Sequence, residues 1–134
     1  YCKEMHEKVF PDPAIDALVI EESQRLGITR RQISDDEIVE RCVYALVNEG
    51  ARILEDGIAA RPLDIDTVWV NGYGFPRFRG GPMFYADRVG LPEVLSRIET
   101  FAEGYQGWAW APAPALRRAA EADMGFRPLN GEGA

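Results

Sequence analysis

The sequence has 134 residues, of which 46% are hydrophobic and 28% are charged, and its formal net charge is −7. This length is enough for one domain with a modest core, and the composition is ordinary for a globular protein. The acidic balance argues against nucleic-acid binding, because that binding depends on neutralising phosphates with Lys and Arg. We therefore expect no nucleic-acid partner.

The amino-terminal residues predict a linker and then a helix. Residues 1–12 are polar and mixed, and we interpret them as a linker remnant. Asp12 is a good N-cap and Pro13 suits the first helical position, so a helix is expected over residues 13–26. Gly27 is a typical stop for such a helix. The chain begins at Tyr1 and not at Met, so we expect a piece of a longer protein.

Ser34 opens the longest predicted helix. Ser34 and Glu37 have the spacing of a capping box, and Gly57 marks the expected end after about 22 residues, a length near 33 Å. Gly50 in the middle of this helix costs about 1 kcal/mol relative to Ala. We attribute it to the close approach of another helix, and we place this helix at the centre of a small bundle.

The long helix carries three polar or reactive side chains at Cys42, Asn48 and Glu49. Cys42 falls in the apolar pattern and is predicted to be a small buried core residue. Asn48 and Glu49 could be polar site residues, but the preferred prediction is that they are solvated or cap backbone groups. Cys2 and Cys42 are far apart and lack metal-ligand spacing, so the simplest interpretation is a reduced, cytoplasmic chain. No signal peptide and no apolar run long enough to cross a bilayer are expected.

Pro62 begins the next predicted helix, which ends near Gly72. The β-branched run at residues 67–70 could instead form a strand. Helix is preferred because proline and acids precede the run and a glycine follows it. Asp64 and Asp66 lie two residues apart near the helix start, which favours capping and dipole roles over a general acid–base pair.

Residues 69–85, WVNGYGFPRFRGGPMFY, are predicted to form a loop whose shape is set by glycine and proline. Its aromatic side chains are too numerous for a free solvent loop and should be buried in this domain or against a partner. Arg77 and Arg79 have three possible roles: a docking contact, a salt bridge to the chain's own acids, or a contact to a substrate phosphate. The predicted interface residues are Trp69, Tyr73, Phe75, Arg77, Phe78, Arg79, Phe84 and Tyr85.

The remaining sequence predicts three more helices. A short helix over residues 83–89 ends at Gly90, and a longer one runs from Pro92 to Gly104. Trp108, Trp110 and an Ala-Pro run are expected to form an irregular cover, because the prolines at 112 and 114 disfavour helix. A last amphipathic helix is predicted over residues 115–122, and residues 128–134 are interpreted as a disordered tail.

The known catalytic and cofactor motifs do not fit this chain. Gly72 and Gly74 lack the third glycine of a dinucleotide fingerprint and have no surrounding strand–helix unit. Gly80 and Gly81 lack the Lys-Ser/Thr of a phosphate loop. His6, the one histidine, lies near an exposed terminus with no fixed partner to orient it. We therefore expect no catalytic, cofactor-binding or metal residue.

A family resemblance is carried by the NGYGFP turn at residues 71–76, the RGGPMFYAD segment at 79–87, and the Val89-Gly90-Leu91 step. With the preceding helix ISDDEIVERCVYALVNEGARILEDG, these segments resemble the C-terminal domain of the multifunctional β-oxidation enzymes. Those enzymes join an enoyl-CoA hydratase/isomerase to a 3-hydroxyacyl-CoA dehydrogenase. The resemblance covers about residues 13–126, and the chain is similar to the second of two helical domains.

The resemblance implies an all-α fold like the C-terminal domains of 6-phosphogluconate dehydrogenase and 3-hydroxyacyl-CoA dehydrogenase, over residues 13–127. It implies a fatty-acid β-oxidation parent that uses NAD, although the NAD fingerprint and catalytic residues of the family are not in this chain. It also implies sibling helical and Rossmann domains as partners, and a possible homodimer of the isolated chain. The alternative is a free-standing helical scaffold or binding module with the same fold.

Overall fold

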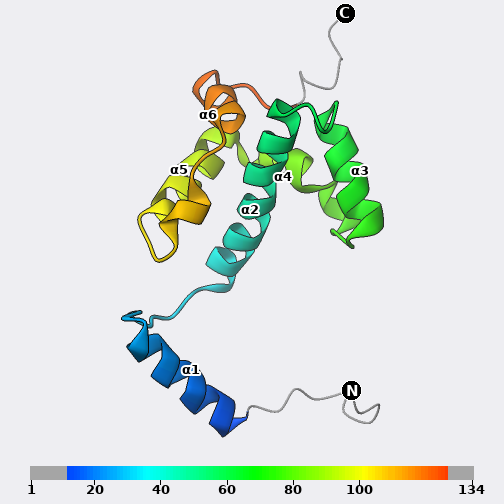
Figure 1. Ribbon diagram of the computed structural model, residues 1–134. Coiled ribbons are helices and arrows are strands. Elements are labelled where there is room, and N and C mark those ends of the chain that lie inside the picture. Colours follow the sequence, from blue (N-terminus) through cyan, green and yellow to red (C-terminus); the bar gives the residue numbers. More distant parts are fainter. Residues whose placement is uncertain (1–11, 127–134) are drawn as a thin grey trace, which may run out of the picture. The chain divides into compact units, whose positions relative to one another are not determined.

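Helix ends lie close to the positions that proline, serine and glycine predict. The computed structural model describes residues 12–126, which contain six α-helices and no strand (Figure 1), so the all-α prediction is confirmed and the strand alternative at residues 67–70 is wrong. The helices are α1 (Pro13–Arg25), α2 (Asp35–Glu55), α3 (Pro62–Gly72), α4 (Pro82–Val89), α5 (Leu91–Ala102) and α6 (Pro114–Glu121), with 3-10 turns η2 (Arg77–Arg79) and η3 (Gly107–Trp110).

Both ends of the chain fall outside the described residues. The predicted linker, apart from its last residue, and the predicted tail at 128–134 lie in those ends, as do His6 and Cys2. None of the described helices is long and apolar enough to cross a membrane. The chain divides into two compact units at residues 33 and 34, inside the range predicted as one helical domain.

Unit 1 contains α1, which begins as its sequence predicts. The Asp12 side chain accepts a hydrogen bond of 2.9 Å from the Ala14 N–H, and Pro13 occupies the first helical position. Gly27 follows the helix with φ +67°, a left-handed conformation that glycine adopts without strain. No residue of α1 is buried, so unit 1 has no core of its own among the described residues.

Unit 2 is built on α2. Ser34 caps it by accepting a hydrogen bond of 3.2 Å from the Glu37 N–H, as the capping pattern predicted. The apolar face is narrower than expected, because Ile38 and Val39 are about half exposed and Cys42 is exposed. The prediction of a buried Cys42 is therefore wrong. The helical period identifies an apolar side but does not say which of its turns another helix covers.

Gly50 lies where α2 meets α4, as predicted. A Cβ built at Gly50 would lie 2.5 Å from the Met83 sulfur, so glycine allows the two helices to approach. Both residues are buried, and Met83 is fully inaccessible to solvent. Helices α5 and α6 complete the core with the following buried apolar residues: Leu91, Val94, Leu95, Ile98, Phe101, Leu116 and Ala120.

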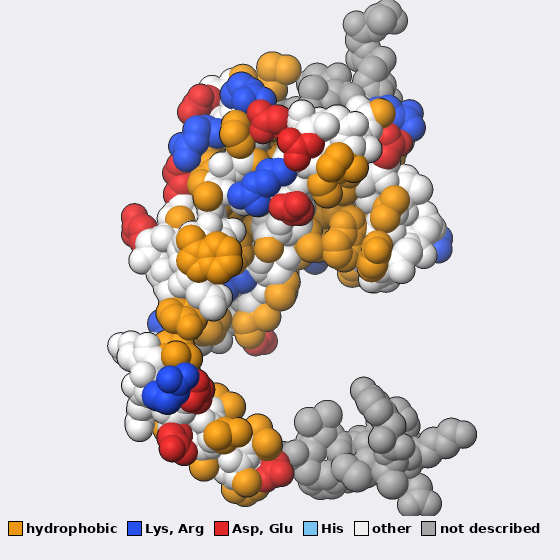
Figure 2. Space-filling model, in the orientation of Figure 1, with side chains coloured by type: hydrophobic (Ala, Val, Ile, Leu, Met, Phe, Trp, Pro, Cys, Tyr) orange, Lys and Arg blue, Asp and Glu red, His pale blue; other side chains and the backbone are white. Residues whose placement is uncertain are grey.

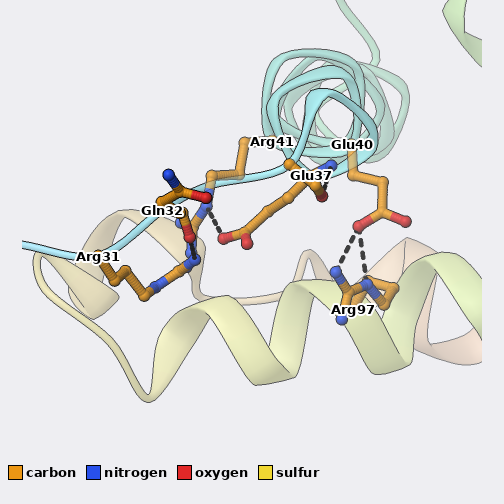
Figure 3. Close-up of polar contacts among 7 residues, drawn as sticks. Arg31, Gln32, Glu37, Glu40, Arg41 and Arg97 are labelled. Carbon is orange, nitrogen blue, oxygen red and sulfur yellow. Dashed lines mark hydrogen bonds and ion pairs between the residues drawn. The ribbon is translucent and has the colours of Figure 1, made fainter.

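An ion pair joins α2 to α5 on the surface of this core. The Arg97 Nε donates to the Glu40 carboxylate at 2.8 Å, and Arg41 pairs with Glu37 at 2.9 Å one turn earlier (Figure 3). The Arg41 guanidinium also lies 4.1 Å from the centre of the Phe101 ring. Partly exposed ion pairs of this kind contribute only about 0 to 1 kcal/mol each to stability.

Asn48 holds the segment before α6. It is buried, and its amide donates to the Ala111 carbonyl at 2.9 Å while its oxygen accepts from the Ala113 N–H at 2.7 Å. The predicted solvated role for Asn48 is therefore wrong, although it does satisfy backbone groups. Pro114 occupies the first position of α6, where a missing N–H has no cost, so proline there begins the helix instead of preventing it.

Candidate functional site

The segment between α3 and α4 has a defined backbone. Residues 69–72 belong to α3 and residues 82–85 to α4, so the connection is shorter than the loop predicted from the sequence. The Trp69 carbonyl accepts hydrogen bonds from the Tyr73 N–H at 3.2 Å and the Phe75 N–H at 3.0 Å. Gly80 ends η2 in the left-handed region at φ +79°. We call residues 73–81 the docking loop.

The predicted interface residues range from half-buried to fully exposed. Tyr73 and Phe78 project into solvent, with exposed fractions of 70% and 84%. Phe75 is half-buried in the loop, and Trp69 and Tyr85 are half-buried on α3 and α4, while Phe84 is exposed at 37%. The structure therefore brings the eight residues to one connection, and the two most exposed aromatics lie on the loop itself.

Arg77 and Arg79 make contacts that leave their charges available. Arg77 donates to the Asn71 side chain at 3.3 Å, and the Arg79 guanidinium lies 5.4 Å from the Phe78 ring and 5.5 Å from the Tyr85 ring. Among residues 12–126 neither arginine forms an ion pair with a carboxylate, whereas the arginines of α2, α5 and α6 do. The described part of the chain thus provides no internal salt bridge for this pair.

A small hollow lies beside the docking loop. It has a volume of about 200 Å³, and its lining includes Arg77, Asn71, Thr67 and Asp66. Asp66 is a carboxylate, which would repel a bound phosphate. This arrangement does not favour the substrate-phosphate role for Arg77.

Asp66 anchors the far end of the loop. Its carboxylate accepts hydrogen bonds from the Met83 N–H at 2.8 Å and the Phe84 N–H at 3.1 Å, so it caps α4 and not its own helix. Burial raises the pKa of Asp66 to about 6, against the lowering effect of those two amide donors. Asp64 stays at the start of α3 in an ion pair with Arg61 at 2.7 Å. Capping was predicted correctly, but the capped helix was not.

Catalytic chemistry has little support in the described residues. Residues 12–126 contain no group of three or more His, Cys, Asp or Glu side chains that could hold a metal ion. Gly72 ends helix α3 and Gly74 follows it, so no strand precedes the turn and it does not have the geometry of a dinucleotide site. We assign no NAD-binding residue to this part of the chain.

The sequence did not predict which backbone groups two buried side chains would bond: Asp66 at the start of α4, beside the site, and Asn48 in the segment before α6, away from it. Asn48 follows Val47 and comes three residues before Ala51, both fully buried, so its place on the inner face of α2 was a usable signal. An amide on an apolar face must bond to something. The proline-rich segment at residues 111–114 precedes a helix, and its backbone groups are the hydrogen-bond partners of the Asn48 amide.

A family model and several individual proteins match this chain, and their names agree with one another. The family model for the 3-hydroxyacyl-CoA dehydrogenase C-terminal domain matches residues 38–128. The chain is 57% identical over 91 residues to the peroxisomal bifunctional enzyme of Danio rerio and 50% identical over 91 residues to that of Homo sapiens. It is 44% identical over 85 residues to the fatty acid oxidation complex subunit alpha of Vibrio vulnificus.

These matches cover most of this chain and a small part of each relative. The alignments include 68% of this chain for the fish and human enzymes and 63% for the bacterial subunit. They span 13%, 13% and 12% of the length of those proteins. The matched residues include α3, the docking loop and α4, with the whole described bundle of unit 2 from residue 38 onward. The chain belongs to the family of 3-hydroxyacyl-CoA dehydrogenase C-terminal domains.

Proposed function

We propose that this chain is a non-catalytic helical domain of a fatty-acid β-oxidation enzyme. Its role is to pack on the sibling helical domain and so support the dehydrogenase half of the parent. The parent would combine an enoyl-CoA hydratase with an NAD-dependent 3-hydroxyacyl-CoA dehydrogenase, and its Rossmann domain would bind NAD. The names of the relatives and the small share of their length that this chain spans support this assignment.

One observation carries the docking role. Arg77 and Arg79 have no carboxylate partner in the described chain, and they share the docking loop with the exposed rings of Tyr73 and Phe78. Arginine and large aromatic residues are the types most enriched at protein interfaces and at their energetic centres. The partner surface should therefore present carboxylates around an apolar recess that accepts Phe78.

The subcellular compartment of the parent enzyme can be proposed from the names of its relatives. The sequence alone predicted a cytoplasmic protein. Relatives with 50% identity or more include enzymes of Danio rerio, Homo sapiens and Cavia porcellus whose names place them in the peroxisome. We propose a peroxisomal parent in place of the cytoplasmic one.

Isothermal titration of this chain against the rest of the parent polypeptide tests the proposal. The unmodified chain should bind, and Phe78→Asp should weaken binding by about tenfold or more. Arg77→Glu/Arg79→Glu should weaken it further, and binding of the unmodified chain should decline with added salt. Trp108→Asp is the matched control, because Trp108 is 82% exposed but lies on η3.

Three results separate the possible functions. Binding that Phe78→Asp leaves unchanged would remove the docking loop from the interface. No binding at all would favour the free-standing scaffold or binding module. NAD titrated against the chain alone should give no heat, and a saturable signal would reveal a cofactor site that the helices do not suggest.

A further inference from the structure

The chain between α1 and α2 is an irregular segment at the surface. Residues 28–34 belong to no helix or strand, and residues 29–34 are all exposed. The Ile28 N–H bonds to the Ser23 carbonyl at 2.8 Å, and the Ser34 carbonyl accepts from the Ile38 N–H at 3.0 Å, so the two helical hydrogen-bond patterns end at these residues. The backbone between them can pair with a protein that binds a peptide in an extended conformation. We call residues 28–34 the junction segment.

Two adjacent arginines, Arg30 and Arg31, lie in the middle of the junction segment. Both are exposed, and Figure 2 shows basic side chains on the surface of unit 1. Arg30 donates to the Ser23 hydroxyl at 3.5 Å, which is long for a hydrogen bond, and Arg31 donates to the carbonyl of its neighbour Gln32 at 3.1 Å. An exposed arginine on irregular chain is the preferred substrate of proteases whose specificity pocket holds a carboxylate, such as trypsin.

Several exposed arginines of unit 2 are held in a helix or in a 3-10 turn. The Arg118 side chain is 65% exposed, but it lies on α6 and pairs with Glu55 at 2.8 Å. Arg77 and Arg79 lie in η2, where the Gly80 N–H already bonds to the Arg77 carbonyl at 3.1 Å. A protease binds several substrate residues in an extended conformation, so regular structure must open before it is cut. The junction segment has no such requirement.

A cut in the junction segment leaves the core of unit 2 whole. Unit 2 begins at Ser34 and the family model begins at residue 38, both after the arginine pair. The buried apolar residues of the described chain lie between Tyr44 and Phe126, and α1 contains no buried residue. Removal of α1 therefore removes none of the buried side chains that hold unit 2 together.

We propose that Arg30 and Arg31 form a processing site for an arginine-specific endoprotease, which separates α1 from the helical domain. The peptide bond after one of the two arginines is hydrolysed: its C–N bond breaks, the arginine carbonyl carbon bonds to the oxygen of a water molecule, and the following residue gains the new amine. The remaining domain keeps the docking loop intact. The processing site is separate from that loop, so neither depends on the other.

Limited digestion of the 134-residue chain with trypsin, followed by intact-mass measurement, tests the site. Within residues 12–126 the first cut should fall after Arg30 or Arg31, and the large product should melt cooperatively at the temperature of the uncut chain. Arg30→Gln/Arg31→Gln should slow the separation of α1 by about tenfold or more, because the specificity pocket loses its ligand. Arg118→Gln is the matched control and should leave the rate unchanged, because Arg118 is exposed on a packed helix.

Three results would overturn the proposal. A first cut elsewhere within residues 12–126, after Arg77 or Arg79 for example, would show that another segment is the accessible one. Equal rates of α1 separation in the double variant and in Arg118→Gln would show that the arginine pair does not direct the cut. A product that no longer melts cooperatively would show that the helical domain needs α1. Far-UV circular dichroism of the uncut variants checks that their folds match, since an unfolded variant would be digested faster and not more slowly.

Discussion

The Asp66 carboxylate accepts a hydrogen bond of 2.8 Å from the backbone N–H of Met83, 17 residues later in the chain. The first amides of any helix lack partners within that helix, so a carboxylate from α3 completes the start of α4. The docking loop lies between these two residues. Its aromatic and arginine side chains are therefore presented from a connection that is fixed at both ends.

Removing the Asp66 carboxylate should destabilise unit 2. Asp66→Ala leaves two backbone donors without their partner, and we expect a loss of about 1 to 3 kcal/mol in the free energy of unfolding. Asp64→Ala is the matched control, because Asp64 is only two residues away but forms a partly exposed ion pair. Urea denaturation followed by circular dichroism measures both. Equal effects of the two substitutions would contradict the anchoring role.

The same carboxylate should make stability depend on pH. Burial raises the pKa of Asp66 to about 6 from an ordinary value near 3.8. The folded protein then keeps a proton that the unfolded chain has released, so this contribution is fully present below pH 3.8 and is lost as the pH rises through 6. Relative to Asp66→Asn, the unmodified chain should lose about 2 to 3 kcal/mol between pH 4 and pH 7.

The measurement for this pH dependence is the difference between two titrations. Urea unfolding of the unmodified chain and of Asp66→Asn at matched pH values cancels the contributions of the other acids. A difference that stays constant from pH 4 to pH 7 would show that the pKa of Asp66 is not raised by burial.

A side chain at Gly81 should strongly destabilise unit 2. The glycine has φ +110°, and a Cβ built there would lie 2.3 Å from an Asp66 carboxylate oxygen and 2.4 Å from the Asp66 Cβ. Gly81→Ala should therefore cost about 3 kcal/mol or more, from backbone strain and from the displaced anchor. Gly72→Ala is the control, because no atom lies within 4 Å of its built Cβ. Thermal melts that rank the two substitutions equally would contradict this expectation.

Asn48 should contribute far more to the free energy of unfolding than its neighbour Glu49. Asn48→Ala removes a buried amide that bonds to both Ala111 and Ala113, and we expect a loss of about 2 to 4 kcal/mol. Glu49→Ala removes an exposed ion pair with Arg52 and should cost about 0.5 kcal/mol or less. Guanidinium unfolding of the two variants provides the comparison. A small effect at Asn48 would mean that water replaces its bonds without cost.

Local signals in the sequence located the helices well. Asp12 and Ser34 accept capping hydrogen bonds, and Pro62 opens a helix as predicted, because these residues act on neighbours within a few positions. The close approach at Gly50 was also correct, since a glycine inside a strong helix needs a packing reason. The family resemblance added the all-α fold, which the structure confirms among the described residues.

Relationships between distant residues could not be predicted in the same way. Asp66 was expected to cap its own helix, yet its partners lie on α4, and nothing near it in the sequence specifies that meeting. Cys42 matches an apolar helical pattern but is exposed, because burial depends on which element packs there. The interface role of Tyr73, Arg77 and Phe78 stays a prediction, since it concerns contacts with residues outside this chain.

The last contacts of unit 2 also set the order in which it can fold during synthesis. Asn48 bonds to Ala113, 65 residues later, and Asp87 accepts a hydrogen bond of 2.6 Å from the Phe126 N–H, 39 residues later. Phe126 is almost fully buried, so the core lacks one of its large side chains until that residue leaves the ribosome. Until the segment that contains Phe126 is synthesised, helices α2 to α5 are incompletely packed. Their exposed apolar surface is then accessible to chaperones.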